Sequence, residues 1–229
     1  MLTSNKLPSL PPLPSQLRRT PRVLLVTVGG LLTAVAMTDL YKVYRGWQTY
    51  SLTPTNEGFS FVAQEELDSA HLAYNLANSI GSTAFFFCGI AFVVWFHRMR
   101  RNAGTFEPAA FRLGPGWAIG SWFFPFVNLV LPYLIARSIW SVGARPAAEG
   151  KVTTWPLHLW WGLFVGNTLL GGVSNYVYNA AESFEEQRDA LVLAMTANAS
   201  WIVAAAAAVY FVIRLTDTLD SKVAAAQPV

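Results

Sequence analysis

Five apolar segments alternate with polar stretches along this chain of 229 residues. They lie at residues 23–44, 72–96, 115–140, 157–177 and 190–213. Each is at least as long as the roughly 20 residues that a helix needs to cross a hydrocarbon core at about 1.5 Å per residue. The pattern therefore predicts an all-α integral membrane helical bundle.

Composition supports this class and excludes several others. Apolar residues make up 53% of the chain and charged residues only 13%, which excludes an ordinary soluble domain and a disordered chain. Cys88 is the only cysteine, so the chain has no internal disulfide and no cysteine-based metal site. Motifs of the HExxH, GxSxG and P-loop types are absent. We therefore expect no catalytic residue, no cofactor and no metal, and favour a non-enzymatic protein over an enzyme.

The third apolar segment differs from the others because it contains Pro125 and Pro132. Proline lacks the backbone N–H and clashes with the preceding helical turn, so it kinks or ends a helix. Two interpretations are open. Residues 115–140 either form a kinked spanning helix, or enter the membrane, turn at the prolines and return as a re-entrant or interfacial hairpin.

The distribution of basic residues favours the hairpin. With the N-terminus inside, five spans place nine of the sixteen Lys and Arg residues on the inner side, whereas four spans plus a hairpin place thirteen there. Cytoplasmic loops are enriched in Lys and Arg. We therefore predict four transmembrane helices plus a Pro-broken hairpin, with five spans as the alternative. Both termini would be cytoplasmic, in a multi-pass membrane protein.

The chain divides into three parts on this pattern. Residues 1–21 form a Pro-rich flexible cytoplasmic lead, residues 22–214 the transmembrane helical domain, and residues 215–229 a short polar tail. The lead is either a spacer or a PxxP ligand at Pro11–Pro14. An alternative interpretation treats residues 1–36 as a cleaved signal peptide. In the fourth segment, Gly162 and Gly166 have a GxxxG spacing that favours close helix approach.

Basic, aromatic and amide residues concentrate on the predicted inner side. This inner-face candidate surface comprises Trp95, Arg98, Arg101, Asn102, Trp117, Trp122, Pro125, Asn128 and Pro132. It is either a cytoplasm-facing docking or ligand surface, or a set of interfacial anchors in which Asn128 satisfies carbonyls freed by the prolines. Anchoring is the commonest use of Trp and Arg at that depth.

A second group of polar residues lies on the predicted outer half. Its members are Asp39, His71, Asn75, Asn78, Asn175 and Asn179. Asp39 with His71 would form a proton relay or part of a metal site, because ionisable residues within spans are candidates for function. The alternative pairs Asp39 with Lys42 and uses the asparagines as interhelical hydrogen-bonding groups.

Two strings around the third segment resemble a known family. They are Val94-Trp-Phe-His-Arg-Met-Arg-Arg-Asn-Ala103 and the run from Pro115 to Tyr133, which contains Trp-x-x-Pro-x-x-Asn-Leu-x-x-Pro at residues 122–132. In these strings the chain is similar to domain-of-unknown-function family 4328, a group of bacterial integral membrane proteins. The resemblance covers about residues 75–215. It implies a membrane-embedded chain and brings no activity with it.

These observations favour a non-enzymatic scaffolding or sensing module with a basic, Trp-rich cytoplasmic face. A small transporter or channel-like subunit using Asn128 and a membrane enzyme acting on a lipid or isoprenoid are the alternatives. Membrane lipids are the expected partners, a cytoplasmic protein and a second copy of the chain are further candidates, and no nucleic acid is expected. Arg outnumbers Lys twelve to four, which is typical of a GC-rich bacterial genome.

Overall fold

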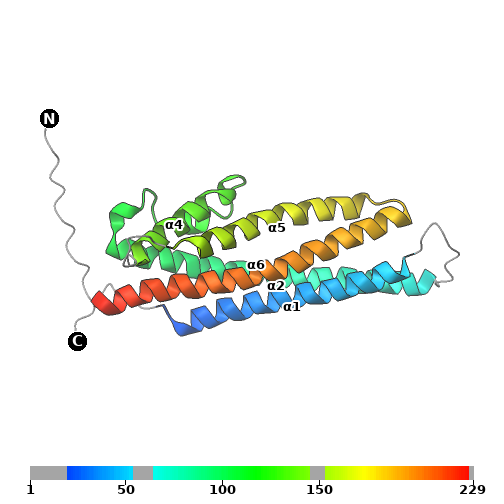
Figure 1. The fold of residues 1–229 in the computed structure, drawn as a ribbon, viewed down its shortest axis with the longest axis horizontal. Coiled ribbons are helices and arrows are strands. Elements are labelled where there is room, and N and C mark those ends of the chain that lie inside the picture. Colours follow the sequence, from blue (N-terminus) through cyan, green and yellow to red (C-terminus); the bar gives the residue numbers. More distant parts are fainter. Residues whose placement is uncertain (1–19, 54–63, 145–152, 227–229) are drawn as a thin grey trace. The chain divides into compact units, whose positions relative to one another are not determined.

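A computed structural model describes residues 20–53, 64–144 and 153–226, and every regular element in these ranges is helical (Figure 1). The elements are α1 (Arg22–Leu52), α2 (Gln64–Phe106), η2 (Pro108–Ala110), α3 (Trp117–Gly120), η3 (Val127–Leu129), α4 (Leu131–Gly143), α5 (Trp155–Ala180) and α6 (Phe184–Ala226). The predicted all-α class is confirmed. Most of the predicted lead, including Pro11–Pro14, lies outside the described residues.

The helices form two compact units. The four-helix unit contains residues 26–53, 64–92 and 155–212 of the described chain, and the α4 unit contains residues 20–25, 93–144, 153–154 and 213–226. The long helices α2 and α6 each contribute residues to both units.

Aromatic contacts hold the four-helix unit together. Tyr74 of α2 lies 5.7 Å from Tyr178 of α5, and the Trp160 ring of α5 stacks on Phe211 of α6 at 4.2 Å between centroids. Early α2 thus meets late α5, and early α5 meets late α6, so these neighbours are antiparallel. Figure 1 shows α5 and α6 joined by a short turn. Small residues of α6, including Ala204 and Ala208, are buried and permit close packing in this unit.

Three helices are long and apolar enough to cross a membrane in the part of the chain that the structure describes. They are Arg22–Leu52, Gln64–Phe106 and Phe184–Ala225. The remaining predicted span, residues 157–177, lies in α5. This helix has 26 residues and no charged side chain but contains His158 and Asn167. The apolar, spanning-length helices are therefore as predicted, and the number of four spans remains a prediction.

Helices α2 and α6 continue well beyond their apolar segments because an apolar stripe continues with them. In α2 this stripe is Trp95, Met99 and Ala103, and in α6 it is Leu215, Leu219 and Val223, all almost completely buried. A spacing of four residues places each set on one helix face. Residues 215–226, which the sequence pattern assigns to a polar tail, therefore form the last turns of α6, with Leu215, Leu219 and Val223 on their buried face.

Residues 115–140 do not form one continuous helix. The four-residue helix α3 is followed by turns, the short helix η3 and then α4, in which Pro132 occupies the first turn. Phe126, directly after Pro125, has a φ of 62°, a left-handed conformation that is strained for a bulky residue. The 13 residues of α4 extend about 20 Å, less than the roughly 30 Å of a hydrocarbon core.

Gly162 and Gly166 of α5 do not mediate a helix contact within the described chain. Both are exposed, and nothing lies within 4 Å of the position that a Cβ atom would occupy at either residue. Gly143 of α4 shows the opposite environment, because a Cβ atom there would lie 3.2 Å from Thr218 Oγ1 and 3.4 Å from the Leu219 backbone nitrogen of α6. In the α4 unit the close approach of two helices therefore depends on Gly143.

Candidate functional site

The α4 unit contains a basic cavity beside the last turns of α2. Its volume is about 830 Å³. The cavity is lined by Leu24, Val94, His97, Arg98, Arg100, Arg101, Asn102, Gly104, Thr105, Pro108 and Pro115. His97, Arg101 and Thr105 recur every four residues and so share one face of α2, whereas Trp95, Met99 and Ala103 are buried. We call this site the basic cavity.

Arg100 fixes the loop after α2 to the helix. Its Nη2 donates to the Leu113 carbonyl at 2.8 Å, and its guanidinium lies 3.5 Å from the Phe111 ring centroid. Gly104 leaves room for this arrangement, because a Cβ atom there would lie 2.5 Å from Arg100 Nη1. His97 Nδ1 lies 3.1 Å from the Pro115 carbonyl, to which it donates as the protonated ring nitrogen. The loop that forms one wall of the basic cavity is thus held at two points.

Arg98 and Arg101 have a different environment from Arg100. No ion pair joins Arg98 or Arg101 to a carboxylate within residues 20–53, 64–144 and 153–226. The Arg98 Nε atom is buried and has no hydrogen-bond partner in the same ranges. Buried donors that stay unpaired cost free energy. The basic cavity therefore carries positive charge from Arg98 and Arg101 that suits an anionic ligand.

The remaining members of the inner-face candidate surface are dispersed through the α4 unit. Trp95 is fully buried and its Nε1 donates to Thr216 Oγ1 at 3.1 Å. Trp122 packs edge-to-face on Phe96, with centroids 5.9 Å apart. Trp117 is 40% exposed and is the tryptophan of this set that reaches the surface. Trp95, Arg98, Arg101 and Asn102 thus share the last turns of α2, while Trp117 lies on α3.

The predicted apex of the broken segment is aromatic and exposed. Phe123, Phe124 and Phe126 are 73%, 54% and 84% exposed. Pro125 between them is also exposed, whereas Asn128 is half-buried in η3 and Pro132 is buried in the first turn of α4. The Asn128 backbone N–H donates to the Phe124 carbonyl at 3.0 Å. These phenylalanines are not among the predicted candidate residues, although the string Phe-Phe-Pro-Phe at a helix break was a signal for them.

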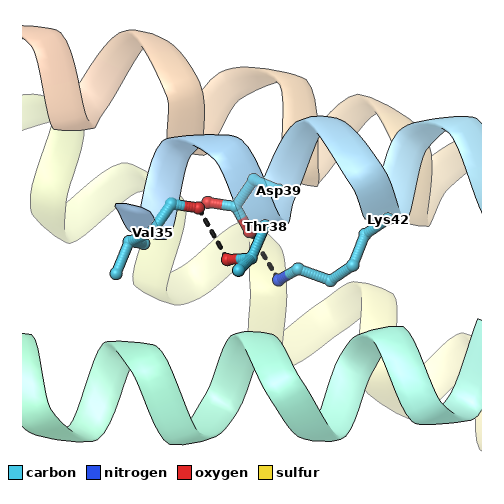
Figure 2. Close-up of polar contacts among 4 residues, drawn as sticks. All are labelled: Val35, Thr38, Asp39 and Lys42. Atoms are coloured by element: carbon cyan, nitrogen blue, oxygen red, sulfur yellow. Dashed lines mark hydrogen bonds and ion pairs between the residues drawn. The ribbon is translucent and has the colours of Figure 1, made fainter. Parts of the chain in front are cut away.

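In the four-helix unit, Asp39 forms an ion pair with Lys42, one helical turn further along α1. Figure 2 shows the Lys42 side chain folding back along α1 toward the Asp39 carboxylate. Both side chains are largely buried, with 4% of Asp39 and 14% of Lys42 exposed. Gly81 of α2 accommodates the lysine, since a Cβ atom at Gly81 would lie 2.8 Å from Lys42 Cε. The pair neutralises its own charge within the helix bundle.

Asp39 forms its ion pair with Lys42 and none with another of the outer-half candidates among the described residues. His71 and Asn78 are half-buried, whereas Asn75, Asn175 and Asn179 are exposed. Asn179 Nδ2 donates to the Asn175 carbonyl on its own helix at 2.8 Å. The described residues contain no cluster of three or more His, Cys, Asp or Glu side chains that could hold a metal ion. Asp39 thus pairs with Lys42, as the alternative interpretation of the sequence predicts, rather than with His71.

Two further polar residues of the four-helix unit were not among the predicted candidates. Asn167 of α5 is only 2% exposed, and its Nδ2 donates to the Leu163 carbonyl at 2.8 Å. Arg188 of α6 donates through Nη1 to the carbonyls of Tyr50 and Thr53 at the end of α1, at 2.9 and 2.8 Å. It thereby satisfies carbonyls that a helix end leaves without intrahelical partners. Its position beyond the last turn of another helix could not be read from the sequence.

Comparison with known proteins assigns the chain to a family. A family model described as a domain of unknown function (DUF4328) matches residues 60–217, more than half of the chain. No curated protein and no solved structure matches it. The match includes the basic residues of α2 and the string at residues 122–132, on which the resemblance rested. The chain therefore belongs to the DUF4328 family.

Proposed function

We propose that the chain is a multi-pass protein of a bacterial cytoplasmic membrane that acts as a non-enzymatic scaffolding or sensing module. In this proposal α1, α2, α5 and α6 cross the membrane, and the α4 unit provides the cytoplasmic contact surface. The observation that carries the proposal is the pair Arg98 and Arg101, which line the basic cavity from α2 without an ion pair to a carboxylate among the described residues. Such a surface attracts an acidic partner.

The proposed orientation follows from charge and from the exposed aromatic residues. With α3 to α4 as a hairpin on the inner side, thirteen of the sixteen Lys and Arg residues are cytoplasmic. Phe123, Phe124 and Phe126 would then insert into the lipid from that side, which accounts for large apolar side chains that are left uncovered. An interfacial location requires no continuous spanning helix in residues 115–140.

The orientation predicts the accessibility of Ser141, an exposed residue of α4. In a Cys88→Ala background, we expect Ser141→Cys to resist a membrane-impermeant maleimide in intact cells and to react after permeabilisation. The matched control is Ser51→Cys, an exposed serine near the end of α1 that the same topology places outside. It should react in intact cells. Reaction of Ser141→Cys from outside would overturn the hairpin and the cytoplasmic position of the α4 unit.

The scaffolding role predicts a contact partner at the exposed part of the α4 unit. A photo-crosslinking amino acid at Trp117 should give a discrete protein adduct in the native membrane, whereas the same group at Tyr176, 74% exposed on α5, should not. Arg101→Glu should reduce the adduct about fivefold, as a loss of roughly 1 kcal/mol would produce. Equal adducts at both positions, or an adduct unaffected by Arg101→Glu, would remove the support for a basic docking surface.

A transporter or channel-like subunit is the second candidate, and one observation favours it. The interruption between α3 and α4 is of the kind from which secondary transporters build substrate sites. This candidate requires residues 115–140 to cross the membrane. Labelling of Ser141→Cys in intact cells would therefore favour the transporter over the scaffolding or sensing module. Substrate flux in proteoliposomes that Asn128→Leu abolishes would then be the decisive measurement.

A further inference from the structure

We propose that the basic cavity binds the phosphate of an anionic phospholipid headgroup. The proposal deepens the sensing role proposed above and rests on the same topology, in which the cavity lies at the cytoplasmic membrane interface. A phospholipid headgroup and a small soluble phosphate both carry a phosphate ester. The apolar residues of the cavity wall favour the phospholipid as the ligand.

The charged side of the cavity fits a phosphate. Arg98 and Arg101 line the cavity and supply two guanidinium groups without an ion pair to a described carboxylate. Guanidinium groups bind phosphate oxygens through paired N–H donors, which makes arginine the preferred residue for this recognition. Arg100 does not compete for the ligand, because the Leu113 carbonyl and the Phe111 ring already hold it. The loop contact of Arg100 instead keeps the wall in place.

The apolar side of the cavity distinguishes a lipid from a small soluble phosphate. Leu24, Val94, Pro108 and Pro115 line it together with the basic residues. Val94 belongs to the apolar run of α2 that ends just before His97, so the cavity begins where that run changes to basic residues. A headgroup bound to the arginines could therefore leave its acyl chains beside the apolar part of α2. Basic pockets at the cytoplasmic ends of spanning helices are suited to acidic lipids.

The size of the cavity agrees with this occupant. A volume of about 830 Å³ lies within the roughly 300–1,000 Å³ of pockets that enclose small organic ligands. It exceeds what a single phosphate ion requires and leaves space for the glycerol part of a headgroup. A divalent cation is disfavoured by the same charges, because all the charged residues that line the cavity are arginines.

The test uses the purified full-length chain, delipidated in detergent and titrated while native mass spectrometry counts bound molecules. The probes are dioctanoyl phosphatidylglycerol, zwitterionic dioctanoyl phosphatidylcholine and free glycerol 1-phosphate. We expect one phosphatidylglycerol to bind about tenfold more tightly than phosphatidylcholine, whose choline cation opposes the arginines. It should also bind about tenfold more tightly than glycerol 1-phosphate, which lacks the acyl chains that contact the apolar part of the wall. Equal binding of glycerol 1-phosphate would overturn the lipid as the source, and equal binding of phosphatidylcholine would overturn recognition of the anionic headgroup.

Variants locate the bound lipid. The double substitution Arg98→Gln and Arg101→Gln should weaken phosphatidylglycerol binding about 25-fold, at roughly fivefold per arginine. Arg137→Gln is the matched control, because Arg137 is an exposed arginine of α4 outside the cavity lining. Phosphatidylglycerol binding by the Arg137→Gln variant should be unchanged. If Arg137→Gln weakened phosphatidylglycerol binding equally, the loss of any arginine charge would explain the effect, and the proposed site would be overturned.

A second variant keeps all the arginines and changes only the volume of the basic cavity. Thr105→Trp should fill part of the cavity and weaken phosphatidylglycerol binding, while circular dichroism reports an unchanged helix content. The Thr105 hydroxyl bonds only within its own helix, to the Arg101 carbonyl at 3.1 Å, so its loss is locally tolerable. Unchanged lipid binding by this variant would place the lipid elsewhere. Failure of the cysteine-labelling test would overturn the topology, whereas failure of these titrations would overturn only the lipid site.

Discussion

Replacing Asp39 with asparagine should lower the free energy of unfolding by about 3 kcal/mol. The reason is that Asp39 is the partner of Lys42, and both side chains are largely buried. Asparagine keeps the volume but removes the negative charge, and the ammonium group of Lys42 is left in the bundle without its counter-ion. The measurement is unfolding of the full chain by SDS in mixed micelles, followed by circular dichroism.

The control for this prediction removes both charges. The double substitution Asp39→Asn and Lys42→Gln should return the stability to within about 1 kcal/mol of the parent chain, because neutral side chains avoid the uncompensated charge. Equal losses in the single and double variants would contradict a coupled pair. They would instead indicate that Asp39 makes a separate contribution, which would reopen its role as an independent ionisable site.

Replacing Trp160 with alanine should destabilise the four-helix unit by about 4 kcal/mol. Trp160 is 3% exposed, lies 5.7 Å from the Phe92 ring and stacks in parallel on Phe211 at 4.2 Å. The substitution removes a large buried ring and leaves a cavity between α2, α5 and α6. The same SDS titration measures the loss, and Trp160→Phe, which retains an aromatic ring, should recover much of it.

An exposed tryptophan on the same helix provides the comparison. Trp155 at the start of α5 is 51% exposed and stacks on Tyr210 with centroids 5.3 Å apart. Trp155→Ala should cost no more than about 1 kcal/mol, because no cavity forms when a half-exposed ring is removed. If the two substitutions had equal effects, burial of Trp160 between three helices would not be the source of its contribution.

The positions of the helices were predictable because each apolar segment has a direct physical requirement. Residues 23–44, 72–96, 157–177 and 190–213 all lie inside α1, α2, α5 and α6. The break in the third segment was predictable for the same kind of reason, since Pro125 and Pro132 cannot donate a backbone hydrogen bond. Helix ends were less predictable, because the turns after His97 and Arg214 are amphipathic and depend on a packing partner.

The types of residue that form the candidate sites were predictable from the sequence, but the contacts between those residues were not. Sequence spacing allowed Asp39 to pair with either Lys42 or His71, and the fold pairs it with Lys42, whose stem lies over Gly81. Arg98 and Arg100 are near neighbours in the chain, yet only Arg100 bonds the loop carbonyl of Leu113. Two residues turn a helix by about 200°, so the two side chains face different surroundings.

The sequence by itself therefore determined the all-α class, the apolar helices and the concentration of basic residues after residue 96, because these depend on local composition and periodicity. Only the tertiary structure decided that, of the arginines that line the basic cavity, Arg100 is bound to the loop while Arg98 and Arg101 have no ion pair to a described carboxylate. That choice depends on the path of the loop over residues 107–116, and the contacts that set this path join residues far apart on α2 and the loop. Long-range contacts of this kind arise from packing, which no local pattern encodes.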